Sequence, residues 1–394
     1  MTDNNVNSPI AAKKRLVIFL HAGFLLIGIL TVLLGQILPF LSARLAFSDE
    51  QAGYLFAAQF AGSLTGAFFY NRTIKKFGYP KMLASGFCLM AAGCFGLNFD
   101  SWFNCSAAIF VYGIGIGATI PAVNLWIIEL NREKSASASN IINFFWGIGA
   151  ISCKPLVDFV GSPQSIFLPT MLLGAALILI GAAILLANYR EVAIEKTDEC
   201  EITPTRIWRQ PTAWLIAVFG FVHVGIESSV AGWLTTYELR LTETNFKRWI
   251  SAALVYFLLL LIGRGIAPLF FRRWRESVLM FGSLIVMTFG IIWILLAESF
   301  LPLTVGAAIL GFGTAAVFPM NVVRFTKFFG SEAMKNATPL FVLGSLGGAF
   351  ATWLVGFIST DFNSLRAGFS VILVSCFLLI ILQIALSKKV SQPT

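Results

Sequence analysis

Long apolar runs alternate with short polar connections along almost the whole chain. Each run holds about 20 mostly apolar residues, the length that an α-helix needs to cross a hydrocarbon core of about 30 Å. We count twelve such runs and predict an all-α membrane protein with one spanning helix per run. The predicted spans are 16–41, 52–70, 81–98, 104–130, 136–160, 165–189, 212–237, 248–271, 277–297, 301–329, 335–359 and 365–386.

One polar stretch near the middle of the chain is longer than the other connections. Residues 190–211 read REVAIEKTDECEITPTRIWRQP, and we interpret them as a cytoplasmic linker. The linker divides the chain into an N-terminal six-helix half, 1–189, and a C-terminal six-helix half, 212–394. Because most other connections are short, neighbouring spans are expected to run antiparallel.

The two halves repeat each other. Glycines and a proline of the first half recur in the second half at a nearly constant separation. The separation is 197 residues for the first two pairs named next and 198 residues for the other three. The pairs are Gly28/Gly225, Gly66/Gly263, Gly115/Gly313, Pro121/Pro319 and Gly149/Gly347. An even number of spans per repeat gives both halves the same orientation, with a symmetry axis along the membrane normal and a binding site expected between them near the midplane.

The composition fits a chain whose solvent is mostly lipid. Hydrophobic residues make up 57% and charged residues only 12%, against about 25% charged in soluble domains. The net charge of +9 is explained by the excess of Lys and Arg in cytoplasmic loops of membrane proteins. Most of the basic residues fall on one side of the predicted spans. We therefore expect a multi-pass protein of the inner (plasma) membrane, with both termini cytoplasmic and no nucleic-acid partner.

One carboxyl group lies inside a predicted span. Glu227 belongs to the apolar stretch 217–237, and His223 precedes it by one helical turn. A carboxylate at that depth costs several kcal/mol unless it is protonated, paired or facing water. We interpret Glu227 as a proton-coupling group whose burial favours a protonated resting state. A neutral carboxyl held by a hydrogen bond between helices is the alternative.

Amides and aromatic rings distributed over both halves are candidate ligands for a polar solute. An amide offers both a donor and an acceptor to a hydroxyl group, although hydrogen bonding between helices is an equal alternative. Trp146 shares a helical face with Asn143 and could stack on a sugar, whereas Trp233 could instead be an interface anchor. The predicted solute-binding set is Gln36, Gln59, Asn124, Asn143, Trp146, His223, Trp233 and Asn321.

Other charged residues inside the spans suggest gates or local pairs. Arg264 and Arg324 lie toward the inner ends of their spans, where they could form an inner gate with Glu129 or a helix C-terminus, or extend to lipid phosphates. Lys154 and Asp158 are four residues apart near the outer end of their span, and are expected to form a local ion pair or to extend outward to the membrane surface.

Several motifs resemble those of the major facilitator superfamily. Residues 66–78, GAFFYNRTIKKFG, resemble its first signature, a glycine followed by a basic cluster, although Tyr70 replaces the usual acid. The stretches GQILPFL, AQFAGSLTG, GIES and IGRG resemble the fucose-permease-like branch, particularly bacterial glucose/mannose–proton symporters. This resemblance implies alternating-access uptake of a hexose with a proton. The branch often has an acid in span 4 or span 1, and span 4 has none before Glu129. Either Glu227 carries more of the coupling, or proton coupling has been lost.

These observations define the expected function and its alternatives. An enzyme is not expected, because the sequence has no HExxH motif, no Cys/His cluster and only two histidines. No cofactor or metal is expected, and the absence of GxxxxGK[ST] excludes ATP as the driver. The main hypothesis is a monomeric secondary transporter with a sugar-like solute, a proton and membrane lipid as partners. The alternatives are an exporter of an amphipathic, drug-like compound and a receptor built on the same fold.

Overall fold

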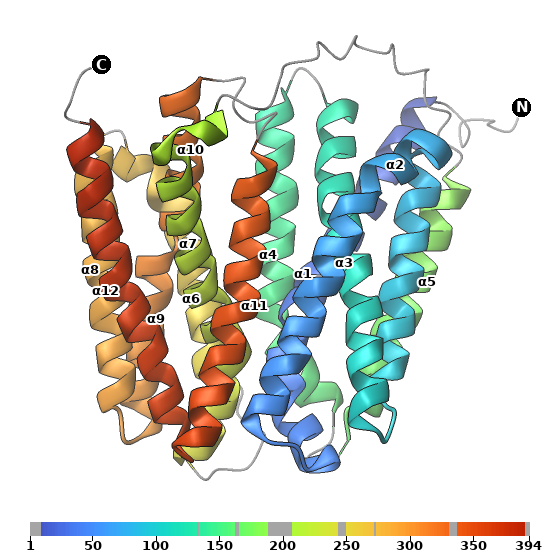
Figure 1. The fold of residues 1–394 in the computed structure, drawn as a ribbon. Coiled ribbons are helices and arrows are strands. Elements are labelled where there is room, and N and C mark those ends of the chain that lie inside the picture. The colour runs from blue at the N-terminus through green and yellow to red at the C-terminus, as the bar shows by residue number, and fades with distance from the viewer. Residues whose placement is uncertain are drawn as a thin grey trace, which may run out of the picture. The chain divides into compact units, whose positions relative to one another are not determined.

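The computed structural model describes residues 9–131, 134–161, 165–187, 207–242, 250–271, 273–330 and 337–390, and these are almost entirely helical (Figure 1). Residues 190–206 of the predicted linker lie outside the described residues. The helices are α1 (Pro9–Leu45), α2 (Asp49–Gly96), α3 (Trp102–Leu130), α4 (Ser135–Val160), α5 (Phe167–Leu186), α6 (Pro211–Thr242), α7 (Ala252–Phe271), α8 (Glu276–Leu296), α9 (Phe300–Thr314), α10 (Val317–Phe329), α11 (Thr338–Asp361) and α12 (Leu365–Val390).

The described helices correspond to the twelve predicted spans, although the helix boundaries differ at two places. Helix α2 holds two spans, because Gly78 adopts a φ of 78° and a ψ of 166° and turns the chain between two helical arms. Glycine adopts a positive φ at no steric cost, so this turn needs no separate loop. Helices α9 and α10 form a single span that is interrupted at Ala315 and Ala316. The prediction of an all-α protein with twelve spans is confirmed.

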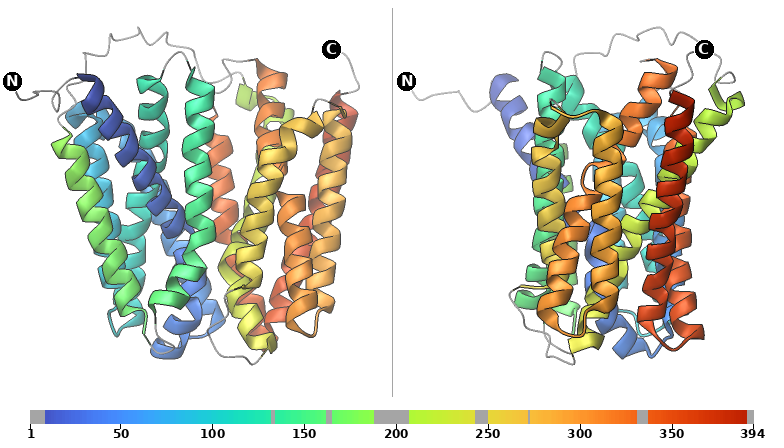
Figure 2. Two further views of the ribbon diagram at one scale, coloured as in Figure 1. Left: turned by 180° about the vertical axis from the view of Figure 1, so that it is seen from behind. Right: turned by 90° about the vertical axis from the view of Figure 1, so that its left-hand side faces the viewer.

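The helices group into two compact units that cut across α1, α2 and α4. Unit 1 contains residues 1–31, 61–150 and 167–203, and unit 2 contains residues 32–60, 151–166 and 204–394. Within unit 2, α6 packs along α11, α9 contacts both α7 and α8, and α12 contacts α6, α8 and α11 (Figure 2). The later part of α1 and the first part of α2 therefore pack with the second sequence repeat.

The repeated glycines make equivalent contacts in the two repeats. A Cβ on Gly115 of α3 would lie 2.9 Å from the backbone nitrogen of Met90, and a Cβ on Gly313 of α9 would lie 2.6 Å from that of Met287. Met90 and Met287 are separated by the same interval as Gly28 and Gly225. The same close helix approach is thus built twice, which supports the internal duplication inferred from the sequence.

A second pair of contacts follows the same rule. A Cβ on Gly149 of α4 would lie 2.0 Å from the carbonyl oxygen of Leu25 in α1, and a Cβ on Gly347 of α11 would lie 2.0 Å from that of Phe221 in α6. Small residues let helix backbones approach closely in membranes, where association depends on van der Waals packing. Here glycine is required because any side chain would collide with backbone, which cannot rotate away.

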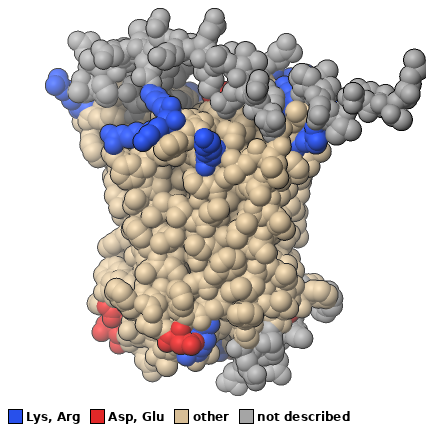
Figure 3. All heavy atoms as spheres, turned by 90° about the vertical axis from the view of Figure 1, so that its right-hand side faces the viewer, with Lys and Arg blue, Asp and Glu red and all other residues tan. Residues whose placement is uncertain are grey.

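The outer surface is apolar over a wide band. Leu186 is 81% exposed, Leu296 74% and Leu301 71%, and such exposure on many helices is expected of a surface that contacts lipid. On the face shown in Figure 3, Lys and Arg gather at one end and an uncharged band separates them from charged residues at the other end. Eight helices or helix pairs in the described residues are long and apolar enough to cross a membrane.

The glycine contacts generate a stability prediction. Gly347→Ala should destabilise the protein by about 1–3 kcal/mol, because its Cβ would overlap a backbone carbonyl of α6. The matched control is Gly282→Ala in α8, where a Cβ meets no atom within 4 Å, so this variant should keep the parent's stability or increase it. Thermal unfolding in detergent measures both. Equal midpoints for the two variants would contradict the packing argument.

Candidate functional site

The middle of α6 carries an ion pair. Glu227 Oε1 accepts a hydrogen bond from Arg264 Nη2 of α7 at 3.0 Å, and its Oε2 lies 3.6 Å from His223 Nε2. The Glu227 and Arg264 side chains are 22% and 31% exposed, whereas that of His223 is almost completely buried. Glu227 is thus paired with Arg264 in the structure, and the protonated resting state expected from the sequence stays a prediction.

The partner of Arg264 differs from the expected one. Sequence analysis suggested an inner gate with Glu129 or a helix C-terminus, but in the structure Arg264 contacts Glu227. Two charges inside a membrane protein compensate each other best as a direct pair, and α6 and α7 pack against each other within unit 2. Glu129 instead accepts a hydrogen bond from the Tyr79 hydroxyl at 2.8 Å, within unit 1.

His223 is buried beside this pair in an otherwise apolar environment. Its ring stacks on Phe318 of α10, with ring centroids 6.4 Å apart. Among the described residues, neither ring nitrogen has a hydrogen-bond partner. The imidazole Nε2 lies 3.6 Å from Glu227 Oε2, which places His223 directly beside the ion pair.

Helix α10 contributes two buried polar residues that hold neighbouring helices. Asn321 donates from Nδ2 to the carbonyl oxygen of Ile216 in α6 at 3.0 Å. Arg324 donates from Nη2 to Gln383 Oε1 of α12 at 2.7 Å, and its guanidinium lies 5.5 Å from the Phe219 ring centroid. Arg324 is only 5% exposed, so neither the predicted gate pairing with Glu129 nor the extension to lipid phosphates describes it.

Three further residues of the predicted set are buried within unit 2. Gln36 accepts a hydrogen bond from Thr235 Oγ1 at 2.7 Å, and Gln59 is buried in α2. Trp233 donates from Nε1 to the carbonyl oxygen of Thr352 at 3.0 Å and is fully buried. The indole therefore packs between helices, and the interface-anchor alternative is wrong for this residue.

The remaining predicted residues meet in unit 1 and stay accessible. Asn143 Nδ2 donates to Asn124 Oδ1 at 3.0 Å, which joins α4 to α3. One turn along α4, Trp146 Nε1 donates to Thr31 Oγ1 of α1 at 3.3 Å. Asn143 is exposed and Asn124 and Trp146 are half-buried. Thr31 was missed by sequence reasoning, because a threonine in an apolar helix usually bonds only its own backbone.

The local ion pair predicted in α4 is present. Lys154 Nζ donates to Asp158 Oδ1 at 2.5 Å, one helical turn away. Both side chains are largely buried, and the pair neutralises itself within one helix. It therefore contributes a compensated charge to unit 2, whereas the Glu227–Arg264 pair joins two different helices.

Two repeats of membrane-spanning helices, with a partly exposed ion pair in the middle of one span, define the class of a membrane transporter of small solutes. The chain belongs to the Major Facilitator Superfamily, whose sequence model matches residues 20–343. It is therefore a multi-pass membrane transporter and not an enzyme, as the sequence motifs suggested.

Individual relatives agree with the family and with the branch expected from the sequence. The chain is similar to the glucose/mannose transporter GlcP of Bacillus subtilis (strain 168), with 23% identity over 353 residues that cover 86% of each chain. The solved structure of the nucleoside transporter NupG is similar, with a TM-score of 0.76, 13% identity and coverage of 97% of this chain and 100% of that one. The E. coli fucose:proton symporter FucP gives a TM-score of 0.61, 18% identity and coverage of 96% and 98%. The two structures show the fold alone.

Proposed function

We propose that this transporter takes up a small polar solute together with a proton, and that the solute is a hexose-type sugar. The observation that carries the proposal is the Glu227–Arg264 pair in the middle of α6 and α7, with His223 at 3.6 Å from the carboxyl. Ionisable groups at that depth are expensive and are retained mainly for ion or substrate pathways.

The pair supplies a way to link a proton to a solute. While Glu227 is ionised, its carboxylate accepts a hydrogen bond from the guanidinium of Arg264 and pairs with its charge. A proton on Glu227 removes the negative charge, weakens the pair and leaves Arg264 N–H groups available to a hydroxyl oxygen of the solute. The solute then binds the protonated state more tightly, and by linkage it also favours proton uptake. Release of the proton re-forms the pair and displaces the solute.

The amides and indole in unit 1 support a hydroxyl-rich solute. Asn143 and Asn124 present donors and acceptors beside the half-buried ring of Trp146. This combination suits a sugar, whose hydroxyl groups need hydrogen-bond partners and whose C–H face packs on an aromatic ring. The relative described as a glucose/mannose transporter supports the same class of solute.

Glu227→Gln tests the coupling. The amide has nearly the same size and keeps an acceptor for Arg264, but it cannot bind and release the transported proton. We expect the variant to bind D-glucose and to exchange it in counterflow, and to lose accumulation driven by an inward proton gradient. Uptake of radiolabelled D-glucose into proteoliposomes measures both activities.

The control for that experiment is Glu298→Gln, at an exposed carboxyl between α8 and α9, which should retain full accumulation. If Glu227→Gln still accumulates glucose with the pH gradient as the only driving force, Glu227 is not the coupling group. Loss of binding in Glu227→Gln, with binding kept in Glu227→Asp, would make the carboxylate a direct ligand of the solute.

Asn143→Ala tests the amide cluster. Removal of the side chain leaves a solute hydroxyl and the Asn124 Oδ1 atom without the hydrogen bond to Asn143, and should weaken D-glucose binding by about 1–3 kcal/mol. Isothermal titration calorimetry on purified protein measures the loss. Asn98→Ala is the matched control in unit 1, since Asn98 bonds the hydroxyl of Thr170 and should matter only for stability. Unchanged affinity in Asn143→Ala would remove this cluster from the binding site.

The membrane orientation is also a proposal, based on the asymmetry of Lys and Arg. A cysteine at Asp100, in the connection between α2 and α3, should react with an impermeant maleimide added to intact cells. A cysteine at Lys76, at the turn inside α2, should react only after the cells are permeabilised. The opposite pattern of labelling would place both termini outside.

A further inference from the structure

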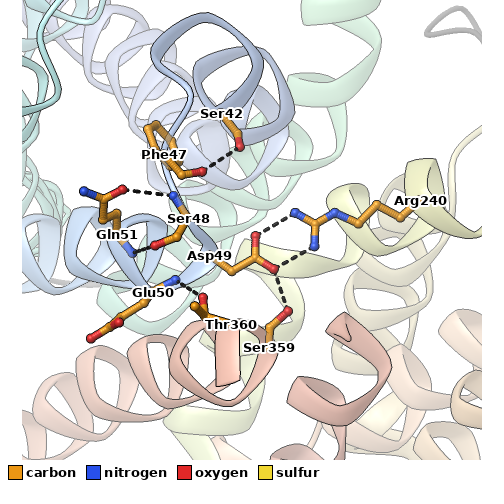
Figure 4. A network of polar contacts seen from close by, with 9 residues as sticks. All are labelled: Ser42, Phe47, Ser48, Asp49, Glu50, Gln51, Arg240, Ser359 and Thr360. Carbon is orange, nitrogen blue, oxygen red and sulfur yellow. Dashed lines mark hydrogen bonds and ion pairs between the residues drawn. The ribbon is translucent and has the colours of Figure 1, made fainter. Parts of the chain in front are cut away.

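The short connection between α1 and α2 is ordered by a helix cap. The Ser48 N–H donates to Gln51 Oε1 at 3.0 Å, and the Gln51 N–H donates to Ser48 Oγ at 3.2 Å. This reciprocal arrangement is a capping box. It fixes Asp49 as the first residue of α2 and orients its side chain away from the cap, as Figure 4 shows.

Asp49 joins the start of α2 to two helices of the second repeat. Its two carboxylate oxygens accept hydrogen bonds from Arg240 Nη1 and Nη2, each at 2.6 Å. Oδ2 also accepts one from Ser359 Oγ at 2.5 Å. In the next residue, the Glu50 N–H donates to Thr360 Oγ1 at 2.8 Å (Figure 4). Arg240 lies in the last turn of α6, and Ser359 and Thr360 lie in the last turn of α11.

Next to these polar contacts, the backbones of α2 and α11 and those of α1 and α6 approach each other closely. A Cβ on Gly356 of α11 would lie 2.2 Å from the carbonyl oxygen of Asp49, and a Cβ on Gly53 of α2 would lie 2.9 Å from the Cα of Trp353. A Cβ on Gly35 of α1 would lie 2.3 Å from the carbonyl oxygen of Ala231 in α6. These contacts explain why residues 32–60 of the first repeat belong to the same compact unit as the second repeat.

The ion pair is suited to repeated opening. Arg240 is 46% exposed, and exposed pairs are individually weak even though the bidentate geometry is favourable here. Each charge is also stabilised by a helix dipole after the pair separates, because Asp49 is at the N-terminus of α2 and Arg240 is near the C-terminus of α6. The contact can therefore bias a conformational equilibrium without locking it.

We infer that Asp49, Arg240, Ser359 and Thr360 form a conformational latch. It closes the transporter at the end that carries the α1–α2 connection, and it separates once in each transport cycle to admit the solute from that side. The buried seam beneath it, where Phe56 of α2 packs against Trp233 of α6 at 5.9 Å between ring centroids, becomes accessible to water only when the latch is open.

A labelling experiment in nanodiscs tests the latch without reference to any solute. A Phe56→Cys reporter, which replaces a side chain that is 5% exposed, is reacted with a charged maleimide and followed by peptide mass mapping. Added to this reporter, Asp49→Asn or Arg240→Gln should each raise the labelling rate about fivefold. The double variant should label no faster than either single variant, because both remove the same contact.

The matched control is Lys327→Gln, which breaks the exposed ion pair between Lys327 and Glu276 in the same unit and should leave the labelling rate unchanged. Unchanged rates in Asp49→Asn and Arg240→Gln would overturn the latch. Equal acceleration by Lys327→Gln would also overturn it, since the effect would then be general loosening.

A cross-link tests whether the latch has to open during transport. Asp49→Cys combined with Ser359→Cys should form a disulfide on oxidation, stop D-glucose counterflow, and recover it when dithiothreitol is added. Cross-linked protein that still exchanges glucose would show that the latch does not open in the cycle. If the unmodified parent does not exchange glucose, the proposed solute is wrong, and the latch is then judged by the labelling rates alone.

Discussion

A charged side chain within a membrane needs a compensating partner inside the protein, because lipid tails offer none. This constraint determines the arrangement of the buried polar residues. Glu227 and Arg264 come from consecutive helices and neutralise each other, and Lys154 and Asp158 do so within one helix. Arg324 uses an amide and an aromatic face in place of a carboxylate. The Glu227–Arg264 pair joins α6 to α7, and Arg324 joins α10 to α12, so these two arrangements help to hold their helices in one relative position. Under the proposed coupling, protonation of Glu227 would also loosen the contact between α6 and α7.

The packing around these charges is built from glycines that were already visible as a repeat. Gly149 and Gly347 bring α4 onto α1 and α11 onto α6 with the same clearance. Close approach through glycine gives flat contacts without interlocking side chains. Such contacts hold helices together by many weak interactions, which suits a family whose members rock large helical bodies against each other.

The helices could be predicted from the sequence because hydropathy depends only on composition along the chain. The turn at Gly78 leaves two spans in the single helix α2, and the break at Ala315–Ala316 divides one span into α9 and α10, so the described helices and the spans do not correspond one to one. The site was harder to predict, because the pattern does not say which neighbour a helical face meets. Asn143 and Trp146 could be placed on one face of a single helix, but the contact of Asn143 with Asn124 of α3 and the packing of Trp233 inside unit 2 could not be predicted. The partner of Arg264 depends on how α6 and α7 are rotated about their axes, which no residue spacing reveals.

The capping box at Ser48 has a consequence for the length of the α1–α2 connection. Surface loops usually accept insertions, because the entropy of closing a loop rises slowly with its length. Here the connection also sets the distance between Leu45, the last residue of α1, and the carboxylate that meets Arg240. An extra residue between α1 and α2 would leave both helices intact and move Asp49 out of register with α11. Evolution can therefore vary the residues of this connection more freely than it can vary their number.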